Sequence, residues 1–107
     1  MSLDFYLQQM EPTEVFSANI THNLGAMAEA AGIYEVLWRP KETGIEKAHQ
    51  CIAPLEAGLK LLKAKPKKFK KFDSPNGWGT YDGFVRFVEK CLDGCKENPE
   101  ATVRASV

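Results

Sequence analysis

The last seven residues of the chain, "ATVRASV", alternate strictly between apolar and polar side chains. A period of two predicts a β-strand with one buried face. The apolar face of this strand comprises Ala101, Val103, Ala105 and Val107. A strand at the end of a chain is not stable alone, so the rest of the sequence must supply a sheet for it.

Two segments near the N-terminus show the same alternation and are the candidates for that sheet. Their apolar residues are Leu3, Phe5 and Leu7 in "LDFYLQ", and Phe16, Ala18 and Ile20 in "EVFSANI". The proline in "QMEPTE", which lies between them, favours a turn. We therefore expect an N-terminal β-hairpin to which the C-terminal strand is added.

After Thr21 the apolar residues recur with the period of an α-helix. We expect Thr21 or Asn23 to supply the N-cap of a first helix. Gly32 is placed to end this helix in the left-handed conformation. A further helical turn is expected before Arg39 and Pro40 close the segment.

The longest apolar stripe of helical period follows Thr43. Thr43 and Glu46 match a capping box, which predicts a helix start at this point. Pro54 lies inside the stripe and cannot donate a hydrogen bond to Gln50, so we expect a kink or two consecutive helices. Thr80 is expected to cap a last helix. The buried residues of that helix would be Phe84, Val88, Cys91 or Leu92, and Cys95.

The order of these elements predicts an α+β fold. We expect a small antiparallel sheet of about three strands, the N-terminal hairpin plus the C-terminal strand, with about three to four helices packed on one face. A chain of 107 residues is long enough for one hydrophobic core, so residues 1–107 are predicted to form a single domain. The content of 44% hydrophobic and 26% charged residues is typical of a globular protein.

The sequence shows neither a membrane span nor an export signal. Its apolar runs are too short to cross a bilayer, and the N-terminus has no basic segment followed by an apolar stretch. We therefore expect a cytoplasmic protein without a membrane partner, in which Asn19 of the sequon "NIT" is not glycosylated. The three cysteines, Cys51, Cys91 and Cys95, lack the spacing of a disulfide framework and fit a reducing compartment.

The motifs of phosphate loops, hydrolases and metal sites are absent from the sequence. His49 and Cys51 are two residues apart and do not share a helix face, whereas Cys91 and Cys95 share one that is apolar. Buried structural thiols are therefore favoured over a reactive pair. We expect no catalytic residue, no cofactor and no metal. Whether the protein is an enzyme stays open, and a function without catalysis is favoured.

Two sets of residues are candidates for ligand or partner binding. Asn19, His22 and Asn23 lie at the predicted junction of strand and helix, where Asn76 and Trp78 of "SPNGWG" would complete a polar pocket. Caps and turns demand the same residue types, and this structural interpretation is favoured. The aromatic residues beside turns either anchor a partner or close the end of the core: Tyr34, Trp38, Trp78 and Tyr81.

The segment "KLLKAKPKKFKKF" has the densest charge, with seven lysines and no acid between residues 60 and 71. A nucleic-acid patch would use these lysines for phosphates and Phe69 and Phe72 for base stacking. Its residues would be Lys63, Lys65, Lys67, Lys68, Phe69, Lys70 and Lys71. The alternative is a solvated helix end, in which lysines complement the helix dipole and both phenylalanines turn inward. Residues 1–38 hold five acids and neither Lys nor Arg, so the charge is segregated.

An ordered set of motifs runs along the chain: "NITHN", "AGIY", "LWRP", "TGI", the proline-interrupted "APLEAGLKLL", and "SPNGWG". Together they resemble a family of small proteins encoded in bacteriophage and prophage genomes, from about Asp4 to Val103. The resemblance implies a bacterial or phage cytoplasm and an accessory role. It carries over neither an activity nor a catalytic residue. The lysines around Pro66 are denser than is typical of this family.

The leading hypothesis is a phage or prophage accessory protein that acts as a small binding module on a host or phage protein. It rests on the absence of catalytic motifs, the segregated charge and the aromatic residues beside turns. One alternative is a nucleic-acid-binding protein that uses the stretch Lys60–Lys71. Another is an enzyme or small-ligand binder centred on Asn19, His22 and Asn76. The uncovered face of the sheet would also allow oligomerisation.

Overall fold

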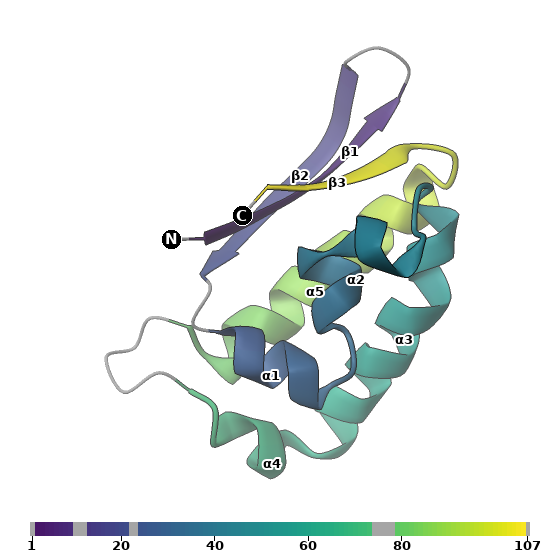
Figure 1. Ribbon diagram of the computed structural model, residues 1–107. Coiled ribbons are helices and arrows are strands. Elements are labelled where there is room, and N and C mark those ends of the chain that lie inside the picture. Colours follow the sequence, from purple (N-terminus) through teal and green to yellow (C-terminus); the bar gives the residue numbers. More distant parts are fainter. Residues whose placement is uncertain (1, 10–12, 22–23, 74–78, 107) are drawn as a thin grey trace.

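The computed structural model of the chain describes residues 2–9, 13–21, 24–73 and 79–106. The strands are β1 (Ser2–Gln9), β2 (Thr13–Thr21) and β3 (Thr102–Ser106). The helices are α1 (Gly25–Ala30), α2 (Tyr34–Trp38), α3 (His49–Ala64), α4 (Pro66–Lys70) and α5 (Tyr81–Glu97), with a 3₁₀ helix, η2, at Pro40–Thr43. The sheet forms one layer, and the helices cover one of its faces (Figure 1).

The sheet has the strand order β2-β1-β3, and both pairings are antiparallel. The N-terminal strand is therefore central, between its hairpin partner and the C-terminal strand. Phe5 lies opposite Ala18 in β2 and opposite Ala105 in β3, which brings the three alternating segments together with their apolar faces aligned. Leu3, Phe5 and Leu7 are fully buried at the centre of this face. The predicted α+β class and the predicted sheet are confirmed.

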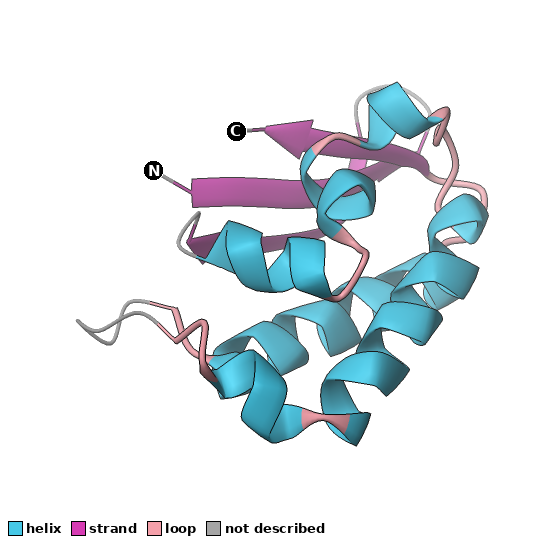
Figure 2. Cartoon of the chain, turned by 60° about the horizontal axis from the view of Figure 1, so that its bottom comes forward, coloured by secondary structure: helices cyan, strands magenta, loops and turns pink. Residues whose placement is uncertain are grey.

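The described helices all lie on the apolar side of the sheet, as the view in Figure 2 also shows. α5 contacts β1 and β2, α2 contacts β1 and β3, and α3 packs against both α5 and α2. There are more helices than the three to four expected, because the helical run breaks at Lys65 and restarts at Pro66. Proline suits the first position of a helix, since its fixed φ is helical and the position needs no N–H donor.

The structure bears on two predictions about the long helices. Pro54 lies inside α3, which is one helix of 16 residues, so the alternative of two consecutive helices is wrong and the alternative of a kink stays a prediction. The Thr80 hydroxyl accepts a hydrogen bond from the Gly83 N–H at 3.2 Å and is the N-cap of α5, as predicted. The predicted apolar residues of α5 are buried: Phe84, Val88, Cys91, Leu92 and Cys95.

The first helix starts differently from the prediction. Thr21 is the last residue of β2 and is not a helix cap, and Asn23 lies outside the described residues. Leu24 is the N-cap residue of α1, and its side chain makes no capping hydrogen bond. Gly32 follows α1 with a φ of 78°, so the predicted left-handed residue at its end is confirmed.

The predicted helix start at Thr43 is wrong, because α3 begins at His49. Thr43 instead ends η2, where its hydroxyl donates to the Pro40 carbonyl at 2.9 Å. Before α3 the backbone is extended, and its Lys47 forms an antiparallel bridge with Thr102 of β3. Strand-like pairing with the end of the chain therefore overrides the local capping signal.

A glutamine closes the start of α3 in place of the predicted capping box. The Gln50 Oε1 accepts hydrogen bonds from the N–H groups of Glu46 at 2.7 Å and Lys47 at 2.8 Å. These two N–H groups lie just before the N-cap residue Ala48, so the Gln50 side chain ties the incoming segment to the start of α3.

Gln50→Ala should lower the free energy of unfolding by about 1 kcal/mol, as does the loss of other capping side chains. Gln50→Glu keeps an acceptor oxygen at the same place and adds a negative charge near a helix N-terminus, so its stability should stay close to wild type. Urea denaturation of the three proteins measures the difference. If Gln50→Ala is as stable as wild type, the Gln50 side chain has no capping role.

Gly58 marks the closest approach of α3 to the segment after α1. A Cβ added there would lie 2.4 Å from Cγ2 of Ile33, which is a stiff β-branched side chain only 1% exposed. Gly58→Ala should therefore destabilise the protein by about 1–3 kcal/mol through overpacking. The higher helix propensity of Ala offsets part of this loss. Ala57→Gly, at an exposed neighbouring position, measures the propensity alone. A Gly58→Ala variant that melts above wild type would contradict the close contact.

Candidate binding surfaces

Six lysines at the end of α3 and around α4 form the most strongly charged surface, called here the lysine patch: Lys60, Lys65, Lys67, Lys68, Lys70 and Lys71. All six side chains are exposed. Lys63 of the same stretch is neutralised by Glu89, with 2.9 Å between Nζ and Oε2, whereas the six make no ion pair with any described residue. α4 lies at the end of the molecule away from the sheet (Figure 1). The patch is therefore a localised positive surface.

The predicted stacking of Phe69 on nucleic-acid bases is wrong, because Phe69 is completely buried. Phe72 is partly buried against the same core. Lys68 Nζ lies 5.7 Å from the centroid of the Phe69 ring, and Lys70 Nζ lies 5.7 Å from that of Tyr81. Phe69 therefore holds α4 on the core, Phe72 packs partly against the same core just after it, and the lysines face solvent.

Hydrogen bonds fix the base of the lysine patch. The Tyr81 hydroxyl donates to the Leu62 carbonyl at 2.7 Å, which joins the start of α5 to the end of α3. The Asp73 carboxylate accepts from the Tyr81 N–H at 2.7 Å. The lysines thus extend from a segment that is bound to the core at both ends.

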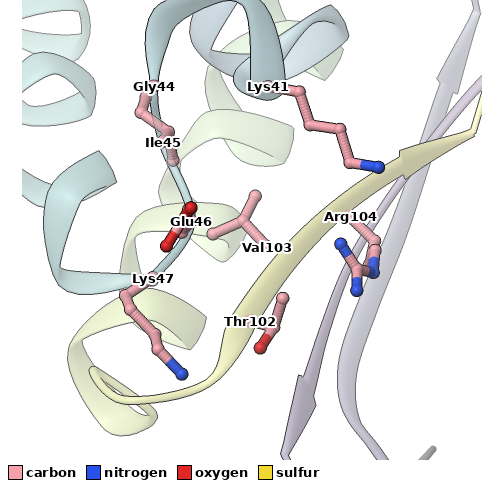
Figure 3. A pocket seen from close by; sticks show the side chains of 8 residues that line it. All are labelled: Lys41, Gly44, Ile45, Glu46, Lys47, Thr102, Val103 and Arg104. Atoms are coloured by element: carbon pink, nitrogen blue, oxygen red, sulfur yellow. The ribbon is translucent and has the colours of Figure 1, made fainter.

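A second basic site lies between η2, the segment before α3, and β3. This β3 pocket has a volume of about 470 Å³. Its lining residues are Lys41, Gly44, Ile45, Glu46, Lys47, Thr102, Val103 and Arg104 (Figure 3). Lys41 and Arg104 bring their cationic ends over the same stretch of β3, and Lys47 lies beside Thr102, its bridge partner (Figure 3). The lining therefore includes three cations from three separate segments, with Lys41 and Arg104 on one side of Thr102 and the Lys47 ammonium on the other (Figure 3).

Sequence reasoning did not identify the β3 pocket. Lys41 and Lys47 lie on either side of a glycine turn, and Arg104 lies on the polar face of the terminal strand. Each is unremarkable by itself. The one available signal was Gly44, whose φ of 78° turns the chain back toward β3.

Of the predicted polar pocket, only Asn19 lies within the described residues. His22, Asn23, Asn76 and Trp78 lie outside them. Asn19 lies on the open face of the sheet, where its Nδ2 donates to Asp4 Oδ1 at 2.6 Å and to Ser2 Oγ at 3.0 Å. Its amide is thus bound to neighbouring strand residues. The hollow above it, about 630 Å³ in volume, is lined by polar side chains together with Ala18 and Tyr6.

The aromatic residues expected beside turns contribute to the core. Tyr34 and Trp38 stack with ring centroids 5.2 Å apart and planes at 11°. Trp38 is 4% exposed and Tyr81 is 7% exposed, so packing accounts for both. Trp78 lies outside the described residues.

The three cysteines lie together where α3 meets α5, and all are fully buried. A hydrogen bond with Cys95 and burial raise the pKa of Cys51, and burial raises the pKa of Cys91 well above its ordinary value. His49 is exposed on the surface. In the described ranges no group of three or more His, Cys, Asp or Glu side chains is gathered as a metal site would require. The cysteines therefore act as small apolar residues of the core.

Comparison with known protein families, with curated proteins and with solved structures finds no match to this chain. Among the described helices, none combines the length and the apolar character needed to cross a bilayer.

The buried thiols should be unreactive in the folded protein. Labelling with a maleimide under native conditions should modify Cys51, Cys91 and Cys95 only at the rate at which the core opens, because the reagent cannot reach side chains that are fully buried. Labelling should become fast across the urea unfolding transition, as mass spectrometry would show. Rapid labelling of any of the three in the native protein would contradict their structural role.

Proposed function

We propose that this protein is a phage or prophage accessory module that binds a partner protein through the lysine patch. The observation that carries the proposal is a set of exposed lysines that form no ion pair with any described residue, held on a base that is fixed to the core. The phage setting and the bacterial cytoplasm come from the sequence resemblance. The unpaired, buried cysteines fit a reducing compartment.

The charge of the patch defines the partner surface. Neighbouring lysines repel one another, and an acidic surface on the partner would relieve this repulsion while steering the encounter. The lysines at Lys67, Lys68 and Lys70 belong to a helix of five residues. Such a helix is about 7 Å long, so the patch matches a compact acidic area on a protein.

Nucleic acid is the second candidate, favoured by seven lysines without an acid between residues 60 and 71. The three lysines of α4, which is about 7 Å long, would face about two phosphates on one strand, which is a small interface. The stretch contains no arginine, the side chain most used to read guanine. With Phe69 buried and Phe72 partly buried, binding would depend mainly on the phosphates and little on base sequence.

Reversing four charges of the patch tests the proposal. The variant Lys67→Glu, Lys68→Glu, Lys70→Glu, Lys71→Glu should bind a fluorescent poly-glutamate peptide more weakly by on the order of tenfold or more, since several ion pairs become repulsive. The matched control changes the same four lysines to Arg and should bind like wild type. All four side chains are exposed, so urea denaturation should show little change in stability for either variant.

The same proteins, used as bait in bacterial lysate with and without nuclease, identify the class of partner. A protein that survives nuclease, and is captured by wild type and the Arg variant but not by the Glu variant, supports the proposal. Nucleic acid that is captured in the same pattern, with binding that weakens steeply as salt is added, supports the second candidate. Capture that is equal for wild type and the Glu variant would exclude the lysine patch as the binding surface.

A further inference from the structure

We infer that the β3 pocket is a separate binding site for a small phosphate monoester, with the phosphate held by Lys41 and Arg104 and Lys47 adding positive charge at the far side of the pocket. This site lies beside the sheet, whereas the lysine patch lies on and beside α4 at the other end of the molecule (Figure 1). The inference does not depend on the proposed function, because it concerns different residues and a different class of ligand.

The charges of the pocket match a phosphate. Lys41, Lys47 and Arg104 make no ion pair with any described residue. Glu46 is the single acid among the lining residues, and the Val103 side chain lies between it and Arg104 in Figure 3. The lining therefore carries two net positive charges, which a phosphate monoester in its doubly charged form would neutralise. A carboxylate would neutralise only one.

The backbone around the pocket is held in place before any ligand arrives. Val103 donates its N–H to the Glu46 carbonyl at 2.9 Å, and Lys47 forms a β-bridge with Thr102. On its other side β3 pairs with β1, where Arg104 lies opposite Tyr6. Arg104 and Lys47 thus extend from backbone fixed by strand pairing, and Lys41 extends from η2, which reduces the entropy lost when they close on an anion. The Thr102 hydroxyl adds a donor beside them.

The space next to the pocket indicates the rest of the ligand. A second cavity, about 420 Å³ in volume, shares Lys41, Val103 and Arg104 with the β3 pocket. Its further lining includes Tyr6, Trp38 and Pro40. Arg39, Glu42 and Ser106 also line it, so its walls are largely polar, with the Tyr6 ring as an aromatic surface. Volumes of this order are typical of sites for small molecules. The ligand class is therefore a phosphate monoester that carries a flat or apolar organic group.

Phenyl phosphate is a suitable probe, because it joins a phosphate to a flat ring. We expect it to bind the full chain saturably, to shift the backbone NMR signals of residues 41–47 and 102–105, and to bind at least about tenfold more tightly than benzoate or phenol. Arg104→Gln and Lys41→Gln should each weaken binding by about tenfold, since each removes a charge-assisted hydrogen bond. Lys90→Gln, at an exposed position on α5, is the matched control and should have no effect.

Several outcomes would overturn the inference. These are the absence of saturable binding, equal binding of benzoate, or unchanged affinity in both pocket variants. The charge-reversed variant of the lysine patch should still bind phenyl phosphate like wild type, and its loss of binding would assign the phosphate to the patch instead. Arg104 is half-buried, so the NMR signals of the core must first show that Arg104→Gln is folded. Lys41 is exposed, and Lys41→Gln decides the question if Arg104→Gln is not folded.

Discussion

The C-terminal segment is held from two sides, and much of the structure depends on this arrangement. β3 pairs with β1 along one edge. Along the other edge, the Val103 N–H donates to the Glu46 carbonyl and the Ala48 N–H donates to the Ala101 carbonyl, both at 2.9 Å. A short terminal strand with a single partner would fray, whereas one bound on both edges is a fixed part of the core. The same hydrogen bonds decide where α3 starts and how close η2 comes to the sheet.

Elements with a clear hydrophobic period could be predicted from the sequence, because burial of one face decides them. The alternation in "LDFYLQ" and "ATVRASV" gave the strands, and buried positions such as Phe84 and Val88 defined the face of α5. The start of α3 could not be predicted from Thr43 and Glu46, because a local capping signal is worth only about 1 kcal/mol. Pairing of Lys47 with Thr102 across the chain outweighs it, and that pairing exists only once the fold has formed.

The candidate sites show the same limit. The lysines from residue 60 to residue 71 were visible in the sequence as a run of like charge. Whether the Phe69 side chain faces solvent or the core could not be predicted, since a phenylalanine between lysines fits either a stacking surface or a buried anchor. In the structure it is the anchor. The β3 pocket corresponds to no local run of charged residues in the sequence, because Lys41 and Arg104 are far apart along the chain. They come to line the same pocket only through the pairing of β3. A site assembled from separate segments is apparent only when the fold is known.

The two basic surfaces differ in how they can use their charge. The lysine patch presents long, exposed side chains to water, where salt screens each interaction. Fixing one of these side chains in an ion pair also costs conformational entropy. Such a surface attracts at a distance and tolerates many geometries. The β3 pocket places a half-buried arginine beside sheet backbone that is already hydrogen bonded, so fewer degrees of freedom are lost on binding and screening is weaker. The patch is thus suited to association with a large acidic surface, and the pocket to selection of one small anion by shape and charge.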